Sequence, residues 1–314
     1  MKVSILGCGE YGLALANCFL EKDFNEVYVW SRFEHEVLKF SQKYLSINFN
    51  TDLKLVTKDA DLVIIAIPVA FLEETMSVFK ECYTGQDILI ASKGIDIKNQ
   101  YFAYEIVVKH LEGAPIGVIS GGTFAHDIKN KKVMGITLAT NISRIKEKVK
   151  RGFENNFLKV QYIDDIIGVS VCGAIKNVMA IGFGMLDGAN MPPSSRFLFL
   201  TEAIYEIRNL IRALNGNVDT IMSYAGIDDI MMTCTSSESR NYTMGSLLGK
   251  KSSALEIDNY KKNNTIEGLG TAKAIYELAK NKNITLPISS VIYNILYRNE
   301  NIDELISLLE NKES

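Results

Sequence analysis

The glycines near the start of the chain have the spacing of a nucleotide-binding turn. Gly7, Gly9 and Gly12 fit the pattern GxGxxG, with Glu10 and Tyr11 between the last two glycines. They directly follow a short apolar run and precede a stretch with helical apolar spacing. In that context backbone N–H groups and the positive end of a helix can face a pyrophosphate. We therefore predict a dinucleotide site here; the alternative is a glycine-rich turn without a ligand.

The end of the next apolar run bears on which dinucleotide is bound. Ser31 and Arg32 stand where a site for NAD usually has an acidic residue for the ribose hydroxyls. Arg32 could instead meet the 2′-phosphate of NADPH, although Glu34 lies close by. The sequence therefore favours NADPH and leaves NADH open.

Lys176 is the charged residue whose surroundings most strongly suggest chemistry. It lies within residues 166–182, a segment that is apolar on nearly every face of a helix and is therefore expected to be buried. Burial lowers the pKa of a lysine towards the range useful for proton transfer. The alternative, a lysine that reaches outward from a helix end, fits this central position less well. Among the histidines only His126, in a glycine-rich loop, is a candidate, and a solvated loop residue explains it more simply.

The elements that must position these residues change character near residue 165. Before it, short runs rich in β-branched residues alternate with amphipathic stretches, at residues 3–6, 26–30, 61–67, 87–91, 116–120, 134–139 and 158–162. This alternation is typical of an α/β fold with a doubly wound parallel sheet. After it, the apolar spacing is helical. We predict a Rossmann-type dinucleotide-binding domain at residues 1–165 and an all-α substrate-binding domain at residues 166–314.

Composition excludes several classes of function. The 314 residues are 47% hydrophobic and 23% charged with a net charge of −3, as expected for a two-domain globular protein. Without a basic stripe, nucleic acid is a poor partner. The five scattered cysteines have no metal-ligand spacing and indicate reduced thiols and no bound metal. We expect no signal peptide, and the longest apolar run, at 62–72, is far short of the ~20 residues of a membrane span. We expect a cytoplasmic protein.

Further segments carry a family resemblance, in order and at compatible spacing. They are Gly7 to Gly12, Ser92-Lys93-Gly94, residues 120–125, residues 172–177, residues 229–241 and residues 266–273. With these segments the chain resembles the bacterial NAD(P)-dependent sn-glycerol-3-phosphate dehydrogenases over most of its length. The resemblance implies reduction of dihydroxyacetone phosphate to sn-glycerol 3-phosphate for glycerophospholipid synthesis. It also raises a homodimer as the assembly to test.

The same resemblance assigns roles to individual residues. Lys176 is the catalytic acid/base, and Asp229 can pair with it. The implied substrate contacts are Lys93, Gly121, Thr123, Lys176, Asp229, Ser239, Arg240 and Asn241. The implied cofactor contacts are Gly7, Gly9, Glu10, Tyr11, Gly12, Arg32, Lys93, Ala125, Arg240, Thr265 and Glu267. Arg240 with its two neighbours would offer a phosphate dianion one charged fork and two neutral donors.

Two other functions stay open. A related dehydrogenase, such as a ketopantoate reductase or a 3-hydroxyacid dehydrogenase, would also use a lysine of its helical domain. Residues 233–241 argue against it, because they supply phosphate-binding groups that a carboxylate substrate would not need in that form. A nucleotide-sensing regulator without turnover would leave a buried Lys176 without a purpose.

Overall fold

The apolar runs of the first half of the chain form one eight-stranded sheet with the order β3-β2-β1-β4-β5-β6-β7-β8. The strands are β1 (Lys2–Leu6), β2 (Glu26–Trp30), β3 (Asn48–Asn50), β4 (Leu62–Ile65), β5 (Asp87–Ile90), β6 (Ile116–Ser120), β7 (Met134–Ala139) and β8 (Leu158–Ile163). Because the strand order runs outward from β1 in both directions, the predicted doubly wound α/β fold is confirmed. The sequence analysis missed β3, whose three residues Asn-Phe-Asn form no apolar run.

The last two strands, β7 and β8, run opposite to the first six strands and so depart from the predicted parallel sheet. β7 pairs antiparallel with β6, with Val118 opposite Ala139, whereas all other strand pairs of the sheet are parallel. The connection between the two strands carries only α6 (Ala125–Lys129), a helix of five residues. Such a helix is too short to carry the chain back along the sheet, as a parallel crossover requires.

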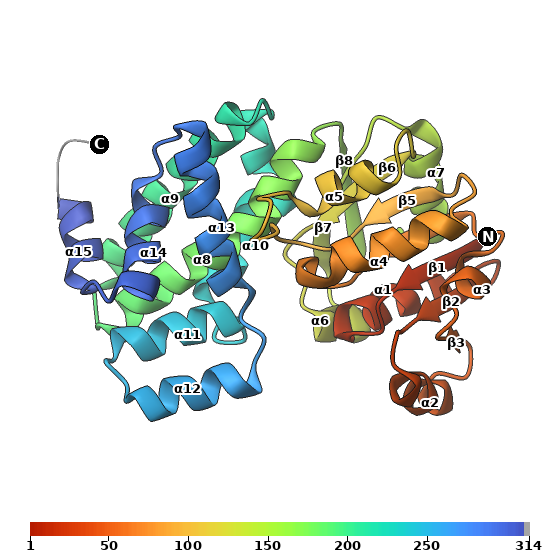
Figure 1. Cartoon of the computed structure of the whole chain (residues 1–314), viewed down its shortest axis with the longest axis horizontal. Helices are drawn as coiled ribbons and strands as arrows, with labels where there is room; N and C mark the ends of the chain where they lie inside the picture. The colour runs from red at the N-terminus through yellow and green to blue at the C-terminus, as the bar shows by residue number, and fades with distance from the viewer. Residues whose placement is uncertain (311–314) are drawn as a thin grey trace. The chain divides into compact units, whose positions relative to one another are not determined.

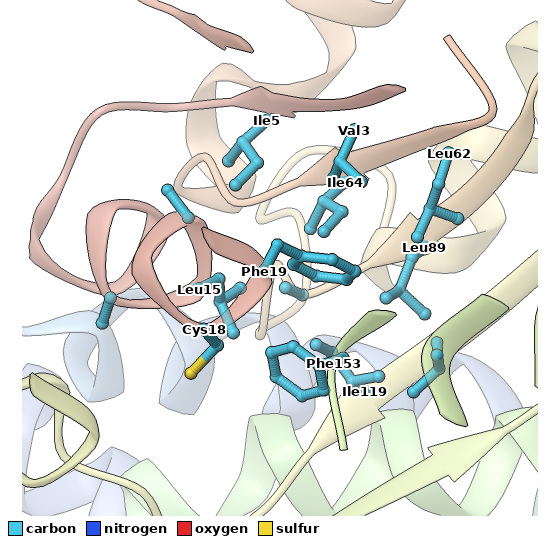
Figure 2. Packing of buried hydrophobic residues seen from close by; sticks show 14 of the residues in the cluster. Val3, Ile5, Leu15, Cys18, Phe19, Leu62, Ile64, Leu89, Ile119 and Phe153 are labelled. Carbon is cyan, nitrogen blue, oxygen red and sulfur yellow. The ribbon is translucent and has the colours of Figure 1, made fainter. Parts of the chain in front are cut away.

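The helices of this first unit hold the glycine turn in place. They are α1 (Glu10–Leu20), α2 (Glu34–Lys43), α3 (Leu53–Thr57), α4 (Leu72–Phe79), α5 (Ala103–His110), α6 and α7 (Ser143–Gly152), with short 3-10 turns at Val69–Phe71 and Lys80–Cys82. α1 lies beside α6, and α4 beside α5 (Figure 1). Figure 2 shows Leu15 and Phe19 of α1 among Ile64 and Leu89 of the sheet. The rings of Phe19 and Phe153 lie 5.0 Å apart, so α1 is anchored by large buried side chains.

The computed structural model describes residues 1–310 and divides into two compact units. The first comprises Met1–Lys93 and Ala103–Ile166, and the second comprises Gly94–Phe102 and the chain from Ile167 onward. Residues 94–102, which the sequence analysis placed in the first domain, therefore cluster with the second unit. The last four residues of the predicted second domain lie outside the described part.

The regular elements of residues 167–310 are all helical. They are α8 (Ile166–Gly188), α9 (Pro193–Ala213), a 3-10 turn (Val218–Met222), a π-turn (Tyr224–Asp228), α10 (Asp229–Thr235), α11 (Arg240–Gly249), α12 (Ala254–Asn263), α13 (Glu267–Lys282), α14 (Pro287–Arg298) and α15 (Asp303–Glu310). The predicted all-α character is confirmed. The sequence analysis did not recognise α10, α11 and α12 as individual helices, because their short segments lack a clear apolar period.

α8 is the core helix of the second unit. Over the described residues it is the one helix long and apolar enough to cross a membrane, and 83% of its apolar window is buried inside the protein. The sequence analysis was wrong to take residues 62–72 as the longest apolar run, since the 23 residues of α8 exceed it. Burial on nearly every side is what its lack of a polar face predicts.

α8 and α11 approach each other backbone to backbone. A Cβ added to Gly184 would lie 2.1 Å from the carbonyl oxygen of Tyr242, and one added to Gly245 would lie 2.0 Å from that of Ile181. Gly249 meets the next turn of α8 in the same way. Because Gly245 meets Ile181 and Gly249 meets Met185, four residues later on both helices, the two helices run parallel. Only glycine permits this contact.

Candidate active site

The turn after β1 has the geometry of a pyrophosphate site. Gly7 has a φ of 120°, and a Cβ there would lie 2.5 Å from the carbonyl oxygen of Ala66. A Cβ on Gly12 would lie 2.1 Å from the carbonyl oxygen of Gly7. Gly9 precedes α1 without a side-chain cap, and a Cβ there would meet nothing within 4 Å. The turn is thus tightly packed at Gly7 and Gly12 and open at Gly9, where the first N–H groups of α1 can face a dinucleotide.

Four of the predicted residues lie together beyond this turn. The Tyr11 hydroxyl is 3.4 Å from Thr123 Oγ1, and the ring of Tyr11 lies 5.7 Å from Lys93 Nζ. Lys93 Nζ also donates to the carbonyl oxygen of Gly121 at 3.4 Å. Ala125 follows shortly after, as the first residue of α6. The fold therefore joins α1, the end of β5 and the loop after β6 into one polar cluster of the first unit.

Arg32 and Glu10 are exposed on the first unit. Arg32 Cζ lies 4.8 Å from the ring centroid of Phe33 and 4.4 Å from that of Phe71. Its Nη1 lies 3.6 Å from a carboxylate oxygen of Glu74, which is itself 76% exposed. An ion pair with this exposure contributes little stability, so the aromatic contacts hold the guanidinium more than the carboxylate does.

Lys176 lies in the middle of α8 and is 7% exposed. Its ammonium hydrogen-bonds the carboxylate of Asp229, which is fully buried, and donates to Thr233 Oγ1 at 3.1 Å. The Thr233 hydroxyl donates in turn to the backbone oxygen of Asp229 at 2.6 Å. Burial raises the pKa of the neighbouring Cys234 thiol, which stays neutral. The ammonium is therefore paired and oriented, as a buried charge must be.

The sequence analysis counted Thr233 only within the phosphate-binding residues 233–241 and did not pair it with Lys176, although it stands one helical turn after Asp229 on α10. Residues four apart on a helix share a face, and this spacing could have identified Thr233. It also missed Asn177, the neighbour of Lys176. Asn177 is 4% exposed and links two predicted residues. Its Oδ1 accepts a hydrogen bond from Asn241 Nδ2 at 3.0 Å, and its Nδ2 donates to Glu267 Oε2 at 3.3 Å.

This amide chain ends at the start of α13, where Asn241 Oδ1 accepts the backbone N–H of Gly268 at 2.9 Å. α8, α11 and α13 are therefore joined by side-chain hydrogen bonds at one point, one residue away from Lys176. A Cβ on Gly268 would lie 2.7 Å from the Asn177 carbonyl oxygen, so α13 can approach only with glycine at this position.

The remaining predicted residues surround these two clusters less closely. Ser239 Oγ accepts the backbone N–H of Tyr242 at 3.2 Å, so it caps α11. Arg240 is exposed at the first position of α11, and Thr265 is exposed just before α13. His126 is exposed on α6 with its ring 3.4 Å from a carboxylate oxygen of Asp127. Over residues 1–310 the structure has no group of three or more His, Cys, Asp or Glu side chains that could hold a metal.

A doubly wound unit with a glycine turn, combined with a helical unit that holds a buried lysine, is the arrangement expected of a nicotinamide-dependent dehydrogenase. Residues 2–145 match the family model described as the NAD-dependent glycerol-3-phosphate dehydrogenase N-terminus, and residues 165–307 match the model of its C-terminus. The chain belongs to the NAD-dependent glycerol-3-phosphate dehydrogenase family. The resemblance that the motifs indicated is thereby confirmed.

Relatives cover the chain from end to end. The glycerol-3-phosphate dehydrogenase (NAD(P)+) of Ligilactobacillus salivarius is 31% identical, over 99% of this chain and 97% of that protein. The crystal structure of glycerol-3-phosphate dehydrogenase from Coxiella burnetii has a TM-score of 0.91 at 26% identity and covers 99% of both chains. A 3-hydroxyisobutyrate dehydrogenase from Mycobacterium tuberculosis shares the fold alone, with a TM-score of 0.53 at 11% identity.

Proposed function

We propose that the chain interconverts dihydroxyacetone phosphate and sn-glycerol 3-phosphate with NAD(P), and that Lys176 is its catalytic acid/base. The observation that carries this assignment is the buried ammonium of Lys176, held by Asp229 and Thr233 in a member of this dehydrogenase family. The residues of the first unit suit the coenzyme, because the glycine turn is open in front of α1. When bound, a nicotinamide coenzyme supplies the hydride for reduction and accepts it in oxidation.

Lys176 supplies the proton. As the ketone of dihydroxyacetone phosphate is reduced, its oxygen becomes an alkoxide that must be protonated or stabilised by charge. The Nζ ammonium can donate this proton, and in the oxidation direction the neutral amine can accept one. Asp229 offsets the charge of the ammonium, while Thr233 Oγ1 fixes the direction of Nζ. The pair thereby keeps a proton donor available in an apolar surrounding.

The phosphate of the substrate requires charge-assisted donors, and α11 provides them. Arg240 is exposed at the start of this helix, and Asn241 beside it is oriented by Asn177 and Gly268. Ser239 accepts a backbone N–H through its lone pair, so its hydroxyl proton is still available to a phosphate oxygen. The proposed substrate contacts also include three residues of the first unit, Lys93, Gly121 and Thr123. The proposed coenzyme contacts include Ala125, Thr265 and Glu267.

The test is absorbance of the reduced nicotinamide with purified protein, coenzyme and dihydroxyacetone phosphate. We expect Lys176→Met to lower kcat by about 10²–10⁴-fold, the usual contribution of an acid/base group. Coenzyme binding, measured by calorimetry, should persist. Lys280→Met is the matched control, because Lys280 is exposed on α13 of the same unit.

A Lys176→Met enzyme within tenfold of the unchanged protein would contradict the role of Lys176. Coenzyme binding without oxidation of coenzyme by dihydroxyacetone phosphate would reject the substrate, and ketopantoate and 3-hydroxyacids would then be tested. The cytoplasmic location and the homodimer implied by resemblance stay predictions, together with a role in glycerophospholipid synthesis. Light scattering tests the dimer, which would have twice the 35.0 kDa of one chain.

A further inference from the structure

An acid and a thiol meet where the first two strands of the first unit end. Cys8 lies in the glycine turn after β1, and Ser31 directly follows β2. Glu36 belongs to the first turn of α2, and one of its oxygens accepts hydrogen bonds from both residues. Its Oε2 lies 2.5 Å from Ser31 Oγ and 2.8 Å from Cys8 Sγ. One carboxylate is thereby tied to both strand ends.

The protonation states of this cluster follow from its contacts. Burial and the hydrogen bond to Glu36 raise the pKa of the Cys8 thiol to about 11, so the thiol is a neutral donor at pH 7. Burial works to raise the pKa of Glu36, but the hydrogen bonds from Cys8 and Ser31 outweigh it and hold the pKa below its ordinary value. Glu36 is therefore a carboxylate near neutral pH. Both bonds end on Oε2, which leaves Oε1 outside the pair.

The position of this carboxylate is the one that matters for coenzyme choice. In doubly wound sheets the dinucleotide lies across the carboxyl ends of the strands, with its pyrophosphate at the first glycine turn. The adenosine ribose then lies near the end of the second strand, where a carboxylate can accept hydrogen bonds from the ribose hydroxyls. NADPH carries a phosphate at that ribose, and a phosphate monoester has a charge of about −1.5 to −2 at pH 7.

We propose, on the basis of the proposed function, that Glu36 selects NADH over NADPH. Its carboxylate accepts hydrogen bonds from the ribose hydroxyls of NADH and repels the 2′-phosphate of NADPH. This reverses the preference that Arg32 suggested in the sequence. Glu36 stands five residues beyond Ser31, and only the turn into α2 brings its carboxylate back to the strand ends. The guanidinium of Arg32 meanwhile lies against Phe33 and Phe71 and faces Glu74.

The test is calorimetric binding of NADH and NADPH to the whole chain, without substrate. We expect the unchanged protein to bind NADH more tightly. Glu36→Gln keeps an acceptor for Cys8 and Ser31 but removes the charge, so the ratio of the two dissociation constants should move towards NADPH by about tenfold, equivalent to 1.4 kcal/mol. Glu34→Gln is the matched control, because Glu34 is an exposed acid in the same turn of α2. This control should leave the ratio unchanged.

If Glu36 had a purely structural role, Glu36→Gln would weaken the binding of both coenzymes equally and leave the ratio of their dissociation constants unchanged. This result would overturn the proposal. So would tighter binding of NADPH by the unchanged protein, or an equal shift of the ratio in both variants. The ratio measured on one preparation is insensitive to a fraction of unfolded protein, and Trp30 fluorescence reports folding of this unit separately. Failure to bind either coenzyme would overturn the proposed function too. NADH binding without turnover of dihydroxyacetone phosphate would overturn that function's substrate alone.

Discussion

Substitution of Asp229 should unfold the helical unit at markedly lower denaturant, because it leaves the ammonium of Lys176 buried without its counter-charge. Lys176 is 7% exposed and Asp229 is not exposed at all. Removal of one member of a buried pair costs about 3–5 kcal/mol. Leucine has the branching and heavy-atom count of aspartate, so Asp229→Leu removes the charge and the hydrogen bonding and keeps the branched shape, while its methyl groups are larger than the carboxylate oxygens.

The expected shift follows from the size of the unit. With a urea slope of about 2 kcal/mol per M, a loss of 3–5 kcal/mol lowers the midpoint by about 1.5–2.5 M. Far-UV circular dichroism follows the helices. Trp30 is the single tryptophan and lies on β2, so its fluorescence follows the first unit. We expect the dichroism transition to move much further than the fluorescence transition.

A double-mutant cycle separates charge from packing. The variant Lys176→Met with Asp229→Leu removes both charges, so it should be more stable than Asp229→Leu alone by about 2 kcal/mol or more. If Asp229→Leu were as stable as the unchanged protein, or no less stable than the double variant, Asp229 would not compensate the ammonium. Our account of how Lys176 is held would then be refuted.

Two further substitutions test how the helical unit is held together. Gly245→Ala should destabilise the helical unit by about 1–3 kcal/mol, because the added Cβ would lie 2.0 Å from the carbonyl oxygen of Ile181. Urea unfolding followed by circular dichroism measures this loss, and an unchanged midpoint would contradict the backbone contact. Glu206 is 4% exposed and accepts N–H groups from Ile288 and Ser289, and burial raises its pKa. A carboxyl group whose pKa is raised in the folded state contributes stability that is lost as pH rises. Glu206→Gln should therefore lower the free energy of unfolding more at about pH 5 than at about pH 8. An equal loss at both pH values would exclude the raised pKa.

The sequence predicted those features that depend on local pattern. Short runs rich in apolar and β-branched residues identified seven of the eight strands, and a strand such as β4, buried along its whole length, needs apolar residues in succession. Lys176 was found in the same way, as the single charge within the apolar residues 166–182. β3 and the helices α10 to α12 lack a strong apolar period, and their formation depends on tertiary contacts.

The contacts within the site were harder to predict, because they join residues far apart in the chain. Cys8 and Glu36 are separated by 28 positions, and no local pattern relates them. The sequence therefore gave weight to Arg32, which directly follows the strand, and none to Glu36. Asn177 was overlooked for a similar reason, since its partners Asn241 and Glu267 become neighbours only when three helices meet.

Glycines explain how those three helices meet with the required precision. Asn177 pairs with Asn241, 64 residues away, and Ile181 meets Gly245 at the same separation one turn later. The parallel contact between α8 and α11 therefore sets the register of the amide pair next to Lys176. A shift of one residue along either helix would place Cβ atoms against carbonyl oxygens and would separate the two amides. The close packing of small residues thus sets the helix register, and the amide hydrogen bonds of Asn241 then fix its side chain beside the lysine that we assign to proton transfer.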